Sequence, residues 1–210
     1  MINKRDVFSL GGLNLVSDIM KMYKTDQDIK ILDVGCGSGY SVNCLSEMGL
    51  DATGIDFSEE IINLGKERYK NINIKVMDAN NLNFPENYFD LILFECSLSV
   101  MKNPKKILSS CKKLLKKDGI ILLSDFFFQK TDIDEDIYTL NYWNNLFSNL
   151  NLQTIIFQDK SKEWKNYLGM VLWEHGELSG LLRGNQNCNI NKDIFKKETG
   201  YFLVILKKRD

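Results

Sequence analysis

The chain has 210 residues, of which 44% are hydrophobic and 26% are charged, as in an ordinary globular protein. Its 27 basic and 28 acidic side chains leave a formal net charge of −1, which attracts neither nucleic acid nor an anionic membrane surface. No apolar run approaches the ~20 residues of a transmembrane helix, and the amino terminus lacks the apolar core of a signal peptide. We therefore expect a cytoplasmic monomer or homodimer without a nucleic-acid or membrane partner.

Apolar runs of strand length alternate with amphipathic segments along most of the chain. The apolar runs predict strands at 30–34, 52–55, 74–77, 91–95, 120–124, 153–158 and 202–206. The amphipathic segments predict helices at 13–23, 40–47, 59–69, 105–116, 138–150 and 162–182. This alternation indicates an α/β protein with a parallel sheet and crossover helices, and the length fits one domain spanning residues 1–210.

Five cysteines stand at irregular positions, and no two of them form a C-x-x-C pair. They are Cys36, Cys44, Cys96, Cys111 and Cys188. Zinc sites and iron–sulfur clusters usually have pairs of cysteines spaced as in C-x-x-C, so we expect no metal. Unpaired thiols in odd number fit the reducing cytoplasm.

The stretch GCGSG, residues 35–39, follows the first predicted strand and precedes a helix. Glycine permits positive φ and a close approach of the backbone to a ligand. The dinucleotide fingerprint is G-x-G-x-x-G, whereas the third glycine here comes one residue early. Asp33, two residues before the turn, adds a negative charge that suits an ammonium or sulfonium group and opposes a pyrophosphate.

Two further carboxylates end the second and third predicted strands. Asp56 follows Gly35 by 21 residues, close to the offset of about 20 at which an acidic residue accepts ribose hydroxyls. Asp78 can accept a proton from an adenine amino group, with the Ala79 N–H beside it. Each carboxylate could instead cap the turn or helix that follows it. Together with Asp33, they favour binding of a cationic, nucleoside-containing cofactor.

At this point the chain resembles the class I S-adenosylmethionine-dependent methyltransferases, in the small-molecule branch of the "methyltransferase type 11" kind. The resemblance rests on LDVGCGSG, GIDFS, MDANNLNFPENYFDLIL and LLKKDGIILLSD, which occur in the order and at the spacing of that family. It implies a Rossmann-like fold with a seven-stranded, mostly parallel sheet in the order 3-2-1-4-5-7-6. In that fold the last strand is antiparallel and helices cover both faces.

The resemblance also implies which residues bind S-adenosyl-L-methionine. The methionine moiety would lie against Asp33 and the glycine turn, the ribose against Asp56, and the adenine between Phe57 and Asp78. The full set is Asp33, Gly35, Cys36, Gly37, Gly39, Asp56, Phe57, Asp78, Ala79 and Glu95. Residues 1–28 would supply a helix that covers the cofactor, and the insertion 129–150 would lie near the substrate pocket or form a surface elaboration.

The function expected from this set is methyl transfer to a small-molecule acceptor by in-line substitution, with S-adenosyl-L-homocysteine as product. Enzymes that methylate amino groups of nucleic acids carry an N/D-P-P-Y/F motif after the fourth strand, where this chain reads ECSLS. Three alternatives remain open at this stage. They are a non-catalytic S-adenosylmethionine-binding regulator, a metalloid- or selenium-directed methyltransferase that uses Cys96, and a nicotinamide oxidoreductase on a related fold.

No catalytic residue is evident, and the candidates each have a structural alternative. Cys96, just past the fourth predicted strand, could contact a soft acceptor or simply fill the pocket wall. Asp125 follows the fifth predicted strand, and the resemblance implies that it points toward the substrate side, where it could bind or deprotonate an acceptor; alternatively it could cap a loop. His175, the single histidine, could act as a base or could be buried on an apolar helix face.

Overall fold

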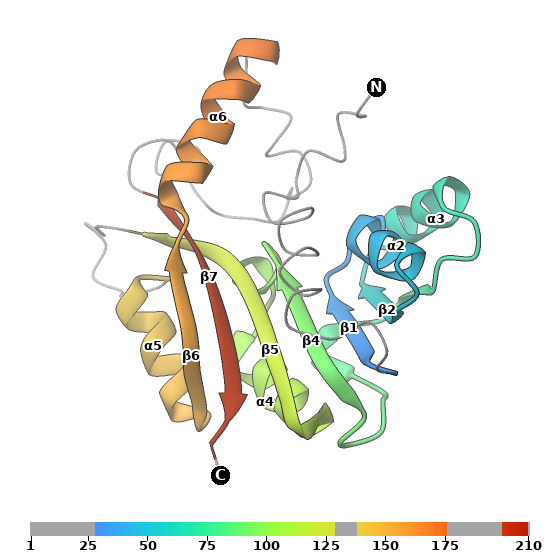
Figure 1. Ribbon diagram of the computed structural model, residues 1–210, viewed down its shortest axis with the longest axis horizontal. Helices are drawn as coiled ribbons and strands as arrows, with labels where there is room; N and C mark the ends of the chain where they lie inside the picture. Colours follow the sequence, from blue (N-terminus) through green and yellow to red (C-terminus); the bar gives the residue numbers. More distant parts are fainter. Residues whose placement is uncertain (1–27, 129–137, 176–198, 210) are drawn as a thin grey trace.

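The computed structural model of the chain describes residues 28–128, 138–175 and 199–209. Seven strands form one sheet in the order β3-β2-β1-β4-β5-β7-β6, in which β7 is antiparallel to both β5 and β6 (Figure 1). The strands are β1 (Lys30–Val34), β2 (Asp51–Asp56), β3 (Ile74–Val76), β4 (Phe89–Glu95), β5 (Leu115–Phe128), β6 (Leu152–Asp159) and β7 (Thr199–Lys208). The strand order and the antiparallel last strand predicted from the sequence are confirmed.

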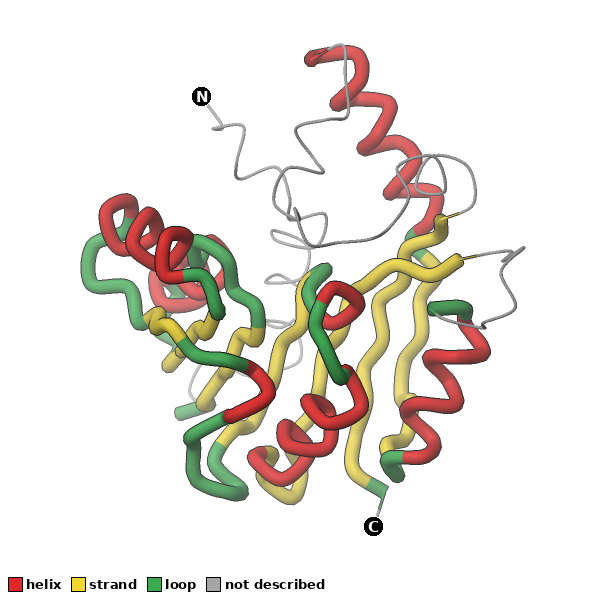
Figure 2. Tube along the Cα trace, turned by 180° about the vertical axis from the view of Figure 1, so that it is seen from behind, coloured by secondary structure: helices red, strands yellow, loops and turns green. Residues whose placement is uncertain are grey.

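Helices cover both faces of the sheet (Figure 2). They are α2 (Tyr40–Glu47), α3 (Glu59–Arg68), α4 (Pro104–Leu114), α5 (Leu140–Asn149) and α6 (Ser161–His175), with short 3-10 turns η2 (Ala79–Asn81) and η3 (Leu98–Val100). Side chains at their first turns fix where two of them begin, because Ser58 Oγ accepts from Ile61 N and Thr139 Oγ1 accepts from Tyr142 N. Within the described ranges, no helix is long and apolar enough to cross a membrane.

Two apolar clusters, one on each face of the sheet, make up the core. The first lies under α4 and α5 and includes Leu108 and Trp143, and the second lies under α2 and α3 and includes Val42 and Ile62. Cys111 of α4 is fully buried in the first cluster. Several predicted segments lie wholly or partly outside the described residues. They are residues 1–27 of the amino-terminal segment 1–28, with its predicted helix 13–23, residues 129–137 of the insertion, and the part of the last predicted helix beyond residue 175.

The fifth strand differs most from its prediction. The helix expected to run to residue 116 ends at Leu114, and β5 starts directly at Leu115, which pairs with Phe89. A register shift between Phe89 and Leu91 then accommodates the charged stretch that the sequence pattern had assigned to a helix end and a turn. At its other end β5 continues to Phe128, so Asp125 lies inside the strand rather than after it.

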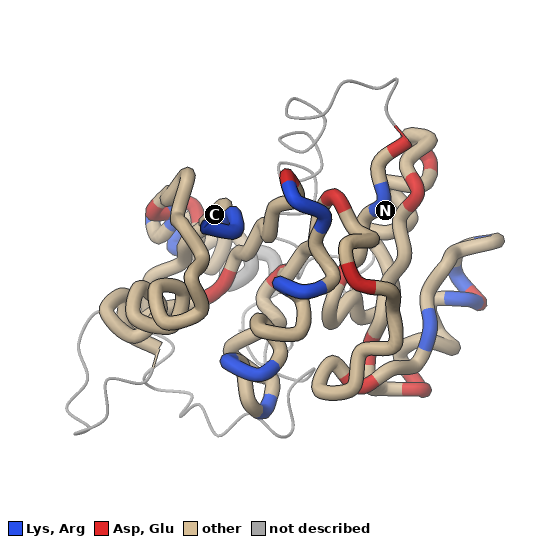
Figure 3. The backbone as a smooth tube through the Cα atoms, turned by 90° about the horizontal axis from the view of Figure 1, so that it is seen from below, with Lys and Arg blue, Asp and Glu red and all other residues tan. Residues whose placement is uncertain are grey.

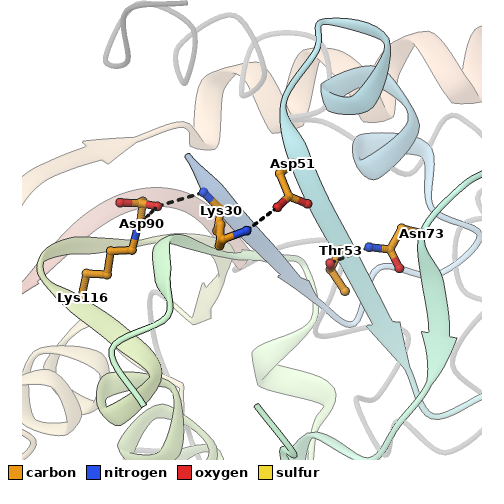
Figure 4. Close-up of polar contacts among 6 residues, drawn as sticks. All are labelled: Lys30, Asp51, Thr53, Asn73, Asp90 and Lys116. Carbon is orange, nitrogen blue, oxygen red and sulfur yellow. Dashed lines mark hydrogen bonds and ion pairs between the residues drawn. The ribbon is translucent and has the colours of Figure 1, made fainter. Parts of the chain in front are cut away.

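Polar side chains link the strands at the amino-terminal edge of the sheet (Figure 4). Lys30 donates from its backbone N to Asp90 Oδ2 at 2.9 Å and pairs through Nζ with Asp51 Oδ2 at 2.8 Å, while Lys116 Nζ reaches the same Asp90 oxygen at 2.8 Å. Basic and acidic residues are intermixed on this side of the described chain (Figure 3). Such partly exposed pairs add little stability, and the functional groups gather at the opposite, carboxyl edge.

Candidate functional site

The turn between β1 and α2 contains three glycines with positive φ, which differ in how closely the rest of the protein packs against them. Gly35, Gly37 and Gly39 all have positive φ, at 80°, 54° and 83°. A Cβ at Gly35 would lie 2.6 Å from Ser97 Cβ, and one at Gly39 would lie 2.6 Å from Ile72 Cδ1. A Cβ at Gly37 would meet no atom within 4 Å. The turn is therefore packed tightly against the protein at both ends and open in the middle, where a ligand can approach the backbone.

Asp56, at the end of β2, holds this turn in place. Its Oδ2 accepts from Gly37 N at 3.1 Å, and its Oδ1 accepts from Ser58 N at 2.9 Å at the start of α3. The backbone N of Gly35 and of Cys36 both donate to Ile55 O, at 2.8 and 3.0 Å. Asp56 thus supports the turn before α3, whereas Ser58 caps the helix itself, and the half-buried Asp56 carboxylate still lies at the edge where a ribose would bind.

Asp33 is the least satisfied charged group of the site. Its side chain is 3% exposed, and Oδ1 has no hydrogen-bond partner. Burial raises the pKa of Asp33 well above its ordinary value, and the negative charges of Glu95 and Asp56 raise it further. A buried carboxylate without a donor is costly unless a cation reaches it. The geometry therefore fits the ammonium group of an amino-acid-containing cofactor.

The groups expected around an adenine lie on the outer side of the site. Phe57, next to Asp56, is 75% exposed, as suits a ring that stacks on a ligand. Asp78 accepts from Asn80 N at 2.8 Å and from Asn80 Nδ2 at 3.1 Å, and these bonds lower its pKa. Asp78 therefore caps η2, the alternative considered for it, and its exposed carboxylate stays ionised; Ala79 beside it is buried.

Glu95 ends β4 between the glycine turn and the rest of the carboxyl edge. Its Oε2 accepts from Ser41 Oγ at 2.8 Å, which links β4 to the first turn of α2. Glu95 is close enough to Asp33 for its charge to raise the pKa of that carboxyl. The structure thus brings together Asp33, Asp56, Glu95 and the glycine turn. The role of Ser41 was not expected from the sequence, where a serine in a helix gives no signal.

Cys96 follows β4 in a left-handed conformation with φ 49°. Its backbone N donates to Ser124 O at 2.8 Å, and its Sγ donates to Tyr201 Oη at 3.5 Å. Burial raises the pKa of the Cys96 thiol, and the charges of Asp125 and Glu95 raise it further. A soft metalloid acceptor binds a thiolate, so the protonated thiol favours the pocket-wall alternative. Among the described residues no three His, Cys, Asp or Glu side chains form a potential metal site.

Asp125 points away from the face that carries Asp33 and Glu95. Its carboxylate is fully buried and accepts from Ser99 Oγ at 2.6 Å, Ser99 N at 2.8 Å and Phe126 N at 2.8 Å. Burial raises the pKa of Asp125 to about 6, against the opposing effect of these hydrogen bonds. The geometry corrects the placement of Asp125 on the substrate side and supports the loop-capping alternative, in which it fixes η3 behind the site.

Replacing Asp125 by asparagine is expected to lower the free energy of unfolding by about 1–3 kcal/mol, because an amide nitrogen would face the buried Ser99 N–H. The pKa of this carboxyl is about 6 in the folded protein, above that of an unfolded aspartate, so the folded state takes up the proton first. Acidification from pH 7 to 5 should therefore widen the stability gap between wild type and Asp125→Asn in urea unfolding. A gap that narrows on acidification would contradict this assignment.

His175 is the last residue of α6, and its side chain lies outside what the structure describes. A base or ligand role for His175 stays a prediction. Tyr201 in β7, in contrast, was not expected at the site. Only the antiparallel register, which pairs Tyr201 with Phe126, brings it to Cys96.

Comparison with known proteins agrees with this geometry. Residues 25–178 match the family model described as a methyltransferase domain. The chain is 27% identical over 178 residues to the phosphoethanolamine N-methyltransferase of Plasmodium falciparum, covering 76% of this chain and 67% of that protein. It is 32% identical over 117 residues to the malonyl-[acyl-carrier protein] O-methyltransferase of Bacillus anthracis, covering 54% of this chain and 43% of that protein.

The fold has solved counterparts. A phosphoethanolamine N-methyltransferase 2 from Haemonchus contortus, in complex with phosphomonomethylethanolamine and S-adenosylhomocysteine, superposes with a TM-score of 0.73 at 18% identity. The match covers 95% of this chain and 54% of that chain. The chain thus spans about two thirds of the first curated relative and about half or less of the other two proteins.

Asp33, Asp56, Glu95 and the glycine turn, residues 35–39, are called the cofactor cradle below. Together, the fold, this cradle and the matching family model define the class of protein. The chain belongs to the methyltransferase domain family.

Proposed function

We propose that the protein transfers the methyl group of S-adenosyl-L-methionine to a small-molecule acceptor. The observation that carries this proposal is the buried Asp33 carboxylate, whose Oδ1 has no partner, beside a glycine turn that is open at Gly37. A cationic amino acid joined to a nucleoside matches both features, since its ammonium group can reach Asp33 while its carboxylate meets backbone N–H groups at the start of α2.

The residues around the cradle have separate tasks in this proposal. Asp33 and the backbone of residues 35–39 hold the methionine moiety. Asp56 accepts hydrogen bonds from the ribose hydroxyls. Phe57 stacks on the adenine, and Asp78 accepts a hydrogen bond from the adenine amino group. When bound, S-adenosyl-L-methionine supplies a methyl group already activated by a positively charged sulfur. The chain's main contribution is then to align the acceptor with that carbon, and such positioning can lower a barrier by about 7–11 kcal/mol.

Ligand binding tests the proposal directly. S-adenosylhomocysteine should raise the melting temperature of the protein, and NADH should not, because the buried Asp33 charge opposes a pyrophosphate. The reverse pattern would overturn the proposal in favour of a nicotinamide enzyme. Release of S-adenosylhomocysteine from S-adenosylmethionine with pools of amines, phenols, thiols, selenite and arsenite then separates an enzyme from a non-catalytic binder. A cytoplasmic location and a single domain over 1–210 stay predictions.

Asp56→Ala is expected to weaken S-adenosylmethionine binding by more than about tenfold, because two ribose hydroxyls lose a charged acceptor. Since Asp56 also holds Gly37, the same change can act through the turn. A cofactor analogue without the two ribose hydroxyls separates these effects in calorimetry. If Asp56 binds the ribose, wild type and Asp56→Ala should bind that analogue with similar affinity. An analogue that still binds wild type much more tightly would assign Asp56 a purely structural role.

A further inference from the structure

One face of the sheet becomes polar where it reaches the carboxyl edge. Glu95 pairs with Ser124 of β5, and Phe126 pairs with Tyr201 of β7. Since side chains alternate along a strand, these four residues lie on one face, which β1 shares through Asp33. The same face lower in the sheet is part of the apolar core under α2. The polar groups therefore continue from the cofactor cradle at β1 towards β7.

Tyr201 is held rigidly at the far end of this row. Its backbone N donates to Ser161 Oγ at 3.1 Å, and its carbonyl accepts from Lys160 N at 2.7 Å. Its hydroxyl accepts from Cys96 Sγ at 3.5 Å, beside the end of β4. Tyr201 is only 3% exposed, and its hydroxyl lies next to Glu95 at the end of β4.

Aromatic rings wall this part of the edge. The ring centroid of Phe126 lies 5.3 Å from that of Tyr201 and 4.9 Å from that of Trp164, which stacks on Tyr167 at 5.9 Å. Phe126 and Tyr167 are half-buried beside the buried Trp164. Aromatic faces attract cations and exclude anions.

Among the residues that the structure describes, the polar groups on this part of the face are the Glu95 carboxylate and several neutral hydrogen-bonding groups. Burial raises the pKa of the Tyr201 hydroxyl, and the negative charge of Glu95 raises it further, so Tyr201 stays a phenol. Ser124 Oγ is buried with no hydrogen-bond partner of good geometry, and its nearness to Tyr201 lowers the pKa of that hydroxyl against the effect of burial. A carboxylate, neutral oxygens and aromatic rings together suit an N–H donor and oppose a phosphate or carboxylate.

We propose that Glu95, Cys96 and Tyr201 form the acceptor end of the site and that it takes a primary or secondary amine. This inference rests on the proposed function and narrows its acceptor. The lone pair of the amine nitrogen forms the new N–C bond, while the S–C bond breaks and its electrons stay on sulfur. The proton that the nitrogen then carries passes to the Glu95 carboxylate. Tyr201 acts as a positioning residue that accepts an N–H hydrogen bond.

A cofactor analogue tests the proposal without a known acceptor. Sinefungin carries an amine where S-adenosylmethionine carries its methylated sulfur, whereas S-adenosylhomocysteine has neither group. Calorimetry should show that wild type binds sinefungin about tenfold or more tightly than S-adenosylhomocysteine, as a charge-assisted hydrogen bond predicts. Glu95→Gln should reduce this ratio to about threefold or less, and Tyr201→Phe should reduce it by a smaller factor while keeping the ring packing.

Two controls make the ratio specific. Asp56→Asn should weaken both ligands alike and leave the ratio unchanged, and Asp118→Asn, at the exposed opposite edge, should change neither affinity. A wild-type ratio near one, or a high ratio that survives Glu95→Gln, would overturn the amine assignment while the proposed function stands. If wild type binds neither ligand, the proposed function fails as well.

Discussion

Asp33→Asn is expected to weaken S-adenosylmethionine binding by about 10- to 100-fold, because the cofactor ammonium loses a charge-assisted partner. The same change should raise the stability of the ligand-free protein by about 1 kcal/mol or more. Burial, Glu95 and Asp56 raise the pKa of Asp33 in the folded protein. The unfolded chain therefore releases the Asp33 proton at a lower pH than the folded protein does, so the ionised carboxylate lowers the free energy of unfolding as the pH rises. Affinity and stability should therefore move in opposite directions.

The pH dependence provides a second measurement of Asp33. A cofactor ammonium stabilises the ionised carboxylate, so binding should release a proton wherever the free protein still holds it, and wild-type affinity should rise with pH. Calorimetry in buffers of different ionisation enthalpy counts this proton, and urea unfolding of the free protein gives the stability. Asp33→Asn should lack the proton release. A variant that is both destabilised and unaltered in proton release would show that the Asp33 carboxylate does not meet the ammonium.

Gly35→Ala is expected to lower the free energy of unfolding by about 2–4 kcal/mol. Its positive φ, 80°, disfavours any side chain, and its Cβ would lie 2.6 Å from Ser97 Cβ and 2.7 Å from Met101 Cε. Ser97 cannot easily move, because its Oγ donates to Val34 O at 2.7 Å. Denaturant unfolding measures the loss, which arises without any ligand.

Gly37→Ala, in the same turn, is the matched comparison for Gly35→Ala. Its φ is 54°, so it carries a similar backbone cost, about 1–2 kcal/mol, but its Cβ would meet no atom within 4 Å. Its larger effect should fall on cofactor affinity, because the new methyl group occupies the open side of the turn. Equal loss of stability in both variants, with normal cofactor binding by Gly37→Ala, would contradict the two purposes assigned to these glycines.

The arrangement of the residues proposed to hold the cofactor could be predicted from the sequence because its signals are local. The bounds of β1 and α2 agree with the predicted ranges, and the glycine turn joins them without an intervening residue to misplace. Strand ends also place carboxylates reliably, since parallel strands bring their carboxyl ends to one edge, as with Asp33 and Asp56. Near contacts in the chain thus determine most of this arrangement.

The acceptor half depends on contacts between distant segments. Cys96 and Tyr201 are 105 residues apart, and their hydrogen bond depends on the register between two antiparallel strands. Asp125 was misplaced for a related reason. The sequence does not show that η3 packs against β5, where Ser99 donates hydrogen bonds to both carboxylate oxygens of Asp125. Single-residue patterns carry no signal for either pairing.

The position of β7 between β5 and β6 has a consequence for how the chain is made (Figure 1). Strand β6 pairs only with β7 among the described strands, so it has no neighbour until residues 199–208 leave the ribosome. Ile155, Ile156 and Phe157 of β6 are exposed even in the folded chain, and until β7 is made the backbone of this apolar strand has no hydrogen-bonding partner strand, a state prone to aggregation. Under the proposed function, synthesis therefore supplies Asp33, Asp56 and the glycine turn, which hold the methyl donor, before it supplies Tyr201, which helps to align the acceptor.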